Sequence, residues 1–126
     1  MKININETKI ISIYSKTFWN ETNIEIQAGE EYKLEANGIW KDLFMKCDGD
    51  GYTSLYMSLY NRWKRSRENN WFALMGSINQ NNDFLIGKTN QIVFKESGIL
   101  FCYANDVKGF YWNNFGELSL TLTRIK

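Results

Sequence analysis

The sequence contains no histidine among its 126 residues. Histidine is the commonest general base in enzymes and the commonest protein ligand of transition metals, so its absence excludes Ser-His-Asp and Cys-His catalytic sites and most zinc sites. Cysteine is scarce, because only Cys47 and Cys102 are present and they form no C-x-x-C pair. Cys102 lies in the apolar run ILFCYA, where a thiol behaves as a small buried hydrophobe. We therefore expect no ordinary hydrolase chemistry and two free, structural cysteines.

The chain also lacks an excess of charge and any long apolar run. Its 15 Lys and Arg residues face 14 Asp and Glu residues, so no global field attracts nucleic acid or an anionic membrane. The first ten residues, MKININETKI, alternate in polarity where a secretory signal needs a continuous apolar stretch. No stretch approaches the roughly 18 apolar residues of a membrane span. We expect no signal peptide, no membrane insertion and, from sequence alone, a cytoplasmic protein.

Proline is absent too, so clusters of glycine and asparagine must mark the turns. Between the turns, apolar residues recur at every second position, which is typical of half-buried strands. These patterns lie around Ile3 and Ile5 and in the ranges 24–28, 32–36 and 118–122. The ranges 71–78 and 98–104 are apolar on both faces, as expected of central strands. We predict one domain over residues 1–126, an all-β antiparallel β-sandwich of jelly-roll type with about eight short strands.

One segment, residues 52–70, follows neither period. Leu55, Leu59 and Trp63 have helical spacing, but the intervening tyrosines and serines fit neither a helix nor a strand. We predict a long irregular loop with room for a short helix. Long insertions in small β domains often carry function, so this segment is a candidate wall of a binding site.

Three oxygen-bearing side chains gather in the last loop, YANDVKGFYWNNFGELSL. They are Asp106, Asn113 and Asn114, with Gly109 and Gly116 on either side of the expected turn. If the loop folds back, one carboxylate and two amide oxygens converge, and such a set suits a hard cation such as calcium. The alternative is that these are ordinary turn residues that hydrogen-bond their own backbone.

The same loop resembles the PA-I galactophilic lectins, bacterial β-sandwich proteins that bind galactose through calcium. The family pattern is approximately Asn-Asp, six residues, Asn-Asn or Asp-Asn, one residue and Gly, and here it reads ND, VKGFYW, NN, F, G. Weaker similarity extends through IQAGEEYKLEANGIW, WFALMGSI, FLIG and SGILFCYAND, and so covers most of the chain apart from 43–70.

The resemblance implies a ligand set. Side-chain oxygens of Asp106, Asn113 and Asn114 and main-chain carbonyls of Phe110 and Asp42 would bind calcium. Two vicinal sugar hydroxyls would complete its shell, with Asp106, Asn113 and Asn114 also hydrogen-bonding the sugar. It further implies a homo-oligomer without a conventional signal sequence, which is compatible with release from the cell.

The family's histidine and glutamine sugar contacts have no counterpart in this chain, so other residues would contact the glycan. The candidates are Asp50, Tyr52 and Trp112, together with Asp48, Arg62, Arg67, Trp40 and Phe110.

Other functions have weaker signals. The turn CDGDGY lacks most of the EF-hand ligands. The basic run NRWKRSR is compatible with single-stranded nucleic acid, but the near-neutral net charge favours a solvated loop whose arginines pair with local acids. Asp42, Asp48 and Asp50 form no evident acid and base pair, so we expect no enzyme. A metal-free interaction or scaffold domain of the same fold is the main alternative to a lectin.

Overall fold

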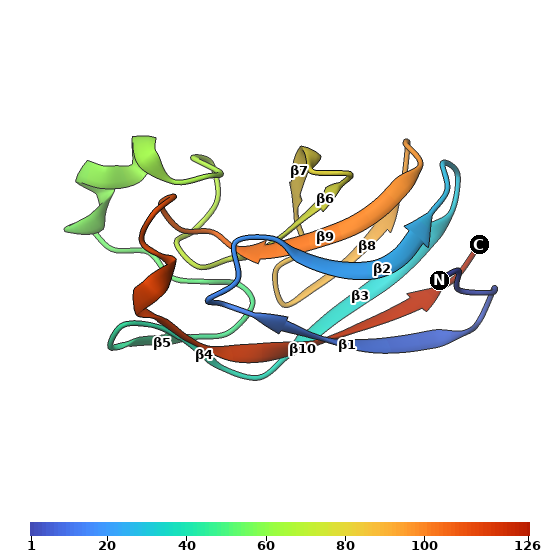
Figure 1. The fold of residues 1–126 in the computed structure, drawn as a ribbon, viewed down its shortest axis with the longest axis horizontal. Helices are drawn as coiled ribbons and strands as arrows, with labels where there is room; N and C mark the ends of the chain where they lie inside the picture. Colours follow the sequence, from blue (N-terminus) through green and yellow to red (C-terminus); the bar gives the residue numbers. More distant parts are fainter.

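In the computed structural model, which describes residues 1–126, the chain forms two antiparallel sheets that face each other across one core (Figure 1). The larger sheet has the order β5-β4-β10-β3-β8, with β1 also paired to β10. The smaller sheet has the order β2-β9-β6-β7. This arrangement confirms the predicted all-β sandwich.

The larger sheet comprises β1 (Thr8–Tyr14), β3 (Glu31–Asn37), β4 (Trp40–Asp42), β5 (Met45–Cys47), β8 (Thr89–Val93) and β10 (Asn114–Arg124). The smaller sheet comprises β2 (Asn20–Ile26), β6 (Leu74–Ile78), β7 (Asn81–Leu85) and β9 (Gly98–Ala104). Two short 3-10 helices complete the chain, η1 (Met57–Trp63) and η2 (Tyr111–Asn113).

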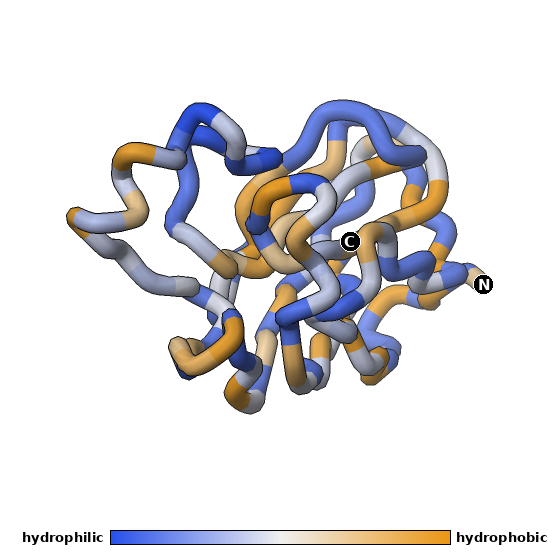
Figure 2. Tube along the Cα trace, turned by 60° about the vertical axis from the view of Figure 1, so that its left-hand side comes forward, coloured by the Kyte–Doolittle hydropathy of each residue, from blue (hydrophilic) through white to orange (hydrophobic).

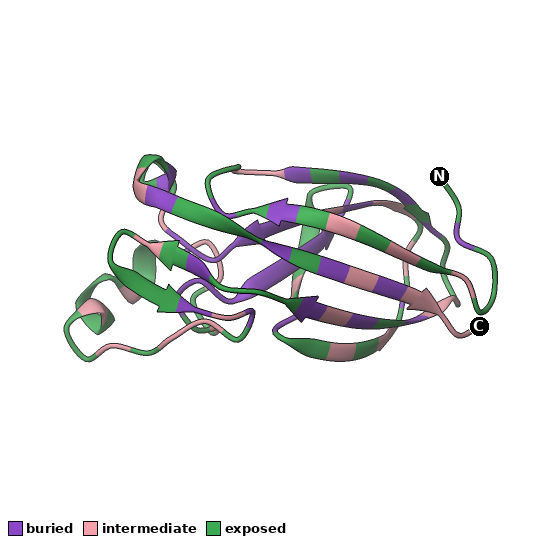
Figure 3. Cartoon of the chain, turned by 90° about the horizontal axis from the view of Figure 1, so that it is seen from below, coloured by how far each residue is buried: buried purple, intermediate pink, exposed green.

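Period-two patterning sets the faces of the strands. Buried and exposed residues alternate along β2, and Figure 3 shows the same alternation along strands of the larger sheet. In β10, Leu118, Leu120 and Leu122 are fully buried, and Leu120 lies opposite Ile11 of β1 and Ala36 of β3. β6 is buried along its whole length because it lies between β9 and β7 beneath the other sheet. The runs that are apolar on both faces are therefore central strands, as predicted.

The N-terminal prediction is wrong. Residues 3–5 form no strand, and the first strand begins at Thr8. A turn intervenes, in which Asn6 has a positive φ of 69°. Ile3 is nevertheless buried in the core, so its hydrophobicity reports packing without strand pairing. Ten strands are present instead of about eight.

Residues 52–70 form the predicted irregular segment, with η1 as its short helix. A bridge between Tyr52 and Trp71 closes its base. It projects from one end of the sandwich, and Figure 2 shows hydrophobic and strongly hydrophilic parts side by side along it. Asn105 holds the returning part, since its Nδ2 donates to the carbonyls of Ser66, Asn69 and Asn70 at 2.9, 3.2 and 2.9 Å.

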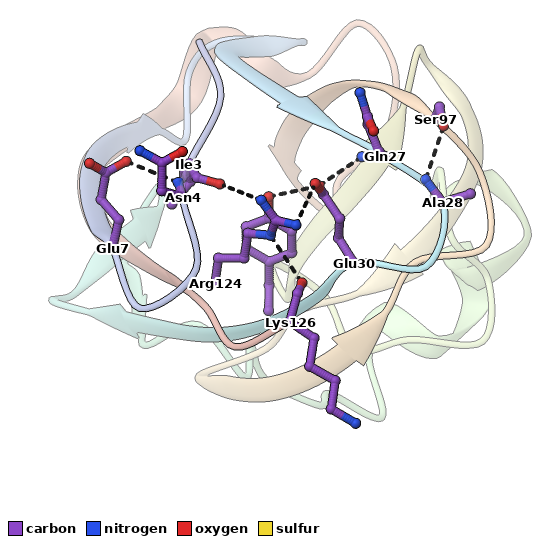
Figure 4. A network of polar contacts seen from close by, with 10 residues as sticks. Ile3, Asn4, Glu7, Gln27, Ala28, Glu30, Ser97, Arg124 and Lys126 are labelled. Atoms are coloured by element: carbon purple, nitrogen blue, oxygen red, sulfur yellow. Dashed lines mark hydrogen bonds and ion pairs between the residues drawn. The ribbon is translucent and has the colours of Figure 1, made fainter.

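Both termini lie at the opposite end of the sandwich (Figure 1). A polar network fixes them there, as Figure 4 shows. The Arg124 guanidinium donates to the Ile3 carbonyl at 3.0 Å and pairs with Glu30 at 3.2 Å. Glu30 Oε1 also accepts from the Tyr32 hydroxyl at 3.0 Å and from the Gln27 N–H at 2.9 Å.

Cys47 and Cys102 are both free and buried, as predicted. Neither helix is long and apolar enough to cross a membrane.

Candidate functional site

The candidate site lies where β4 meets the start of β10, beside the projecting segment. Asp42, the last residue of β4, pairs with Asn114, the first residue of β10. The loop between β9 and β10 supplies the remaining groups, and η2 forms its last part. Two glycines shape it. Gly109 has a φ of +94°, and a side chain at Gly116, whose φ is +91°, would come within 3.1 Å of the Trp40 Cα.

Asp106 is buried, with only 4% of its surface exposed. One carboxylate oxygen, Oδ1, accepts a hydrogen bond from the Val107 N–H at 2.7 Å. The main-chain carbonyl accepts from the Arg65 N–H at 3.1 Å, which fixes the backbone against the projecting segment. The other carboxylate oxygen, Oδ2, is buried and has no hydrogen-bond donor.

The two asparagines present the same feature. The Asn114 Nδ2 donates to the Ser15 carbonyl at 3.0 Å, which fixes the orientation of the amide and leaves its Oδ1 buried without a donor. The Asn113 carbonyl accepts from the Leu43 N–H at 2.9 Å, and its side-chain Oδ1 is likewise buried without a donor. Buried acceptors almost always have partners in native proteins, so three orphans in one loop require an explanation.

The electrostatics of the site are those of uncompensated carboxylates. Burial raises the pKa of Asp106 to about 7, and the negative charge of Asp42 adds to the shift, against the Val107 hydrogen bond and the amide of Asn114. Burial also raises the pKa of Asp42, opposed by the Tyr52 hydroxyl, which donates to its Oδ2 at 2.6 Å. Neither carboxylate has a basic partner within 4 Å.

The site opens into a cavity of about 560 Å³. Asp42, Asp106 and Asn113 form its polar side. Its other wall is apolar and comes from η1 and the β9–η2 loop: Met57, Tyr60, Trp63, Val107 and Phe110. The Tyr60 and Trp63 rings are neighbours, with centroids 5.6 Å apart. The cavity is within the size range of small-ligand sites.

The structure thus brings together all five residues of the expected metal ligand set. Asp42, Asp106, Phe110 and Asn113 line the cavity, and Asn114 pairs with Asp42 beside it. No group of three His, Cys, Asp or Glu side chains gathers anywhere in the protein, so a cation here would also need amide and carbonyl oxygens. That donor chemistry suits a hard cation.

Of the other expected sugar contacts, Tyr52 lies beside the cavity, whereas Asp50 and Trp112 do not line it. The Tyr52 hydroxyl binds Asp42, and Tyr52 lines a second groove of about 440 Å³ that shares Asp42, Met57 and Asn113 with the cavity. Asp50 is not brought to the cavity, because its Oδ1 accepts from the Lys88 N–H at 2.7 Å. The Trp112 side chain is 68% exposed and does not line the cavity either.

Sequence reasoning named residues 52–70 as a candidate wall but not the residues that form it. Met57, Tyr60 and Trp63 follow i, i+3, i+6 spacing, as expected of one face of a 3-10 helix. That spacing was the available signal. The pattern was hard to recognise because Tyr56 and Leu59 are also large hydrophobic residues of the same stretch, although both are exposed.

The basic run has a structural role that the sequence did not indicate. The expectation that its arginines pair with local acids is wrong, since none of them forms an ion pair. The Arg65 guanidinium lies 3.4 Å from the Tyr103 ring centroid, 3.7 Å from Phe18 and 4.4 Å from Trp19. It also donates to the Phe18 carbonyl at 2.6 Å and the Tyr111 hydroxyl at 2.9 Å. Arg65 therefore anchors the projecting segment on aromatic rings.

No protein-family model matches the sequence, and no curated protein matches it. Among solved structures, the chain is similar to one described as the EclA N-terminal domain, a PllA-like lectin, with a TM-score of 0.73 and 18% identity. The similarity covers 91% of this chain and 94% of that chain. At this identity the likeness establishes the fold, and this chain has the fold of that lectin domain. The PA-I family itself stays a resemblance.

Proposed function

We propose that this protein is a lectin that binds a saccharide through a calcium ion held by the loop between β9 and β10. The observation that supports this proposal best is the set of three buried oxygens without donors, Asp106 Oδ2, Asn113 Oδ1 and Asn114 Oδ1. The similarity to a structure described as a lectin domain agrees with it.

A bound cation accounts for the orphan oxygens physically. Leaving a buried acceptor without a partner costs about 1–3 kcal/mol, and more for a charged group. A calcium ion would satisfy all three oxygens at once and compensate the buried charge of Asp106. Water cannot compensate that charge. The hydrogen bond from Asn114 Nδ2 to the Ser15 carbonyl and the one from the Val107 N–H to Asp106 Oδ1 fix both side chains, so Asn114 Oδ1 and Asp106 Oδ2 are held in place. Less conformational entropy is therefore lost when an ion binds.

The same donor set leaves room for a ligand. Calcium takes six to eight oxygens, and the three side chains with the carbonyls of Phe110 and Asp42 supply five. Two adjacent hydroxyls of a sugar fit the remaining positions. Asp106, Asn113 and Asn114 can also accept hydrogen bonds from those hydroxyls, which would orient the sugar ring in the cavity.

The apolar wall would take the other side of the ring. Sugars present a face of C–H groups that packs on aromatic rings, and Tyr60, Trp63 and Phe110 line the cavity. These residues replace the histidine and glutamine contacts of the PA-I lectins. We propose galactose or a related sugar as the ligand because of the resemblance at the loop, with this aromatic wall setting the preference among such sugars.

Isothermal titration with galactose and a series of other monosaccharides, in calcium and then in excess chelator, tests the proposal. We expect binding only in calcium, and loss of both calcium and sugar binding in Asn113→Ala. Asn81→Ala is a matched control because Asn81 is an exposed strand residue far from the loop in the sequence. Calcium binding without any sugar binding would favour the scaffold alternative. Sugar binding that survives in chelator would contradict the calcium mechanism.

A further inference from the structure

A second cavity, of about 480 Å³, lies within the projecting segment and shares no lining residue with the calcium cavity. Polar side chains make up most of its lining. The ones that matter here are Thr53, Asn61, Lys64, Arg67, Glu68 and Asn70. Tyr52 lines this cavity and is its link with the calcium site, because the Tyr52 hydroxyl donates to Asp42.

Lys64 is an unusual residue in its lining. Only 8% of its surface is exposed, yet no carboxylate lies within 4 Å of its Nζ. The Nζ donates to the Asn69 carbonyl at 2.6 Å and lies 5.1 Å from the Trp71 ring centroid. Burial lowers the pKa of this ammonium group. A buried charge without a counter-ion is costly, and an ammonium group can donate three hydrogen bonds, so Lys64 can still bind an anion.

The other charged side chains of the lining form no ion pairs, and the Asn70 Nδ2 donates to the Asp50 carbonyl at 3.2 Å. The Arg67 guanidinium makes no ion pair with any other residue, and Glu68 makes none either. With Lys64 and Arg67 as cations and Glu68 as the one carboxylate, the lining has a net charge of +1. The hydroxyl and amide groups of Thr53, Asn61 and Asn70 match the hydroxyls of a sugar, and Tyr52 and Trp71 supply aromatic surface.

We propose that this cavity binds the carboxylate of an acidic sugar residue, with Lys64 and Arg67 as its cationic partners. The choice of a sugar as the carrier of the carboxylate rests on the proposed lectin function. The single net positive charge favours one anionic group over the repeated phosphates of a nucleic acid, which several cations would have to neutralise. The protein would then bind glycans at two places, through sugar hydroxyls at the calcium site and through a sugar carboxylate at this cavity.

The test is an NMR titration of the full chain after calcium has been removed with a chelator and the chelator has been dialysed away. Removing calcium separates this site from the calcium site, and removing the chelator avoids competition from its own carboxylates. The probes are galacturonate, galactose, inorganic sulfate and a single-stranded oligonucleotide. We expect galacturonate to shift the Trp71 indole and Arg67 signals saturably, and galactose to bind at least tenfold more weakly. Arg67→Gln should weaken galacturonate binding at least fivefold, and Glu68→Gln should strengthen it. Arg62→Gln removes the same charge from outside the cavity and should change nothing.

Three results would overturn the proposal. Equal binding of galacturonate and galactose would remove the role of the carboxylate. Sulfate binding without galacturonate binding would identify a free-anion site. Equal losses in the Arg62 and Arg67 variants, together with tighter binding of a single-stranded oligonucleotide, would indicate a nucleic-acid surface. Failure of calcium-dependent binding alone would leave this result unchanged, because the titration contains no calcium.

Discussion

Asp106 combines two properties that rarely coexist in a stable fold. Its carboxyl is almost fully buried, and no basic side chain lies near enough to compensate its charge. Its pKa is raised to about 7 for this reason, because protonation removes the uncompensated buried charge. Without a cation, the deprotonated residue therefore opposes folding.

Replacing Asp106 by Asn should stabilise the calcium-free protein above pH 7. Burial raises the folded-state pKa of Asp106 above the ordinary value of an aspartate, so the folded protein is most stable below about pH 4 and loses stability as the pH rises through about 7. The expected loss in the free energy of unfolding is a few kcal/mol, since a tenfold change in proton affinity corresponds to about 1.4 kcal/mol. Thermal unfolding in chelator from pH 4 to pH 8 measures it.

Asp106→Asn should abolish this decline, because asparagine keeps the shape and carries no charge. Asp48→Asn removes a loop carboxylate that does not line the cavity, serves as the control and should retain the decline. A variant that is less stable than the natural protein at pH 8 in chelator would show that the Asp106 charge is compensated in some other way.

Calcium affinity should depend on pH through the same group. The ion would bind the carboxylate form, so binding at pH 6 must release a proton, whereas binding at pH 8 releases almost none. Below pH 7 we expect the affinity to fall by up to tenfold per pH unit. Calorimetry in two buffers with different ionisation enthalpies measures the proton release. An affinity that is constant from pH 6 to pH 8 would contradict the assignment of Asp106 as a ligand.

At the scale of elements, η1 and the β9–β10 loop have separate tasks in the proposed site. The loop carries the oxygens, and η1 carries the aromatic wall. Trp63→Ala should therefore weaken sugar binding about tenfold and leave calcium affinity unchanged, since an aromatic stacking contact is worth roughly 0.5–1.5 kcal/mol.

Leu59→Ala is the matched control for this prediction. Leu59 lies on the same helix, is 74% exposed and does not line the cavity, so its removal should change neither affinity. Equal effects of Trp63→Ala and Leu59→Ala would show that η1 does not form a sugar-binding wall.

Arg65 links the projecting segment to the calcium loop. Its guanidinium donates to the Tyr111 hydroxyl at the start of η2, and its backbone N–H donates to the Asp106 carbonyl. Arg65→Met should lower the free energy of unfolding by about 1–3 kcal/mol, because the part-buried Phe18 carbonyl and Tyr111 hydroxyl lose their donor. Calcium affinity should fall as well.

Arg67→Met is the comparison for the Arg65 variant. Arg67 is an exposed arginine of the same segment that forms no ion pair, so its replacement should leave both the unfolding free energy and the calcium affinity unchanged. Chemical denaturation and calcium titration of the two variants provide the measurements. An unchanged calcium affinity in Arg65→Met would limit Arg65 to a role in stability.

The strands that the sequence predicted best are those whose burial follows a strict period. The alternating leucines of β10 and the apolar run of β9 could be assigned from local sequence alone. In a sandwich the first pattern fits a strand with one buried face, and the second fits a central strand. Ile3 misled the prediction because a buried residue in a loop has the same hydrophobicity as one in a strand.

The candidate site was predictable only in part. Asp106, Asn113 and Asn114 are close in sequence and flanked by glycines, so their grouping was visible. The cage around Arg65 joins residues from distant parts of the chain, such as Phe18, Arg65 and Tyr103, and the aromatic residues of η1 reach the cavity only because the projecting segment lies against the β9–β10 loop. Such contacts depend on how the projecting segment folds back, and local pattern does not encode that path.

At the scale of the whole molecule, the polar network that fixes the termini is far from the candidate binding site. The termini and the Arg124 network lie at one end, and the candidate site and projecting segment lie at the other (Figures 1 and 4). The binding end combines the ends of two strands, at Asp42 and Asn114, with the β9–β10 loop and the projecting segment. Assembly into a homo-oligomer stays a prediction, and analytical ultracentrifugation would test it.

A crystal structure of the protein grown with calcium and galactose tests the central claim most directly. We predict an ion with a calcium anomalous signal, bound by Asp106 Oδ2, Asn113 Oδ1 and Asn114 Oδ1 at about 2.3–2.6 Å, with two sugar hydroxyls in its shell. Water molecules alone between these three oxygens, at saturating calcium, would contradict the account.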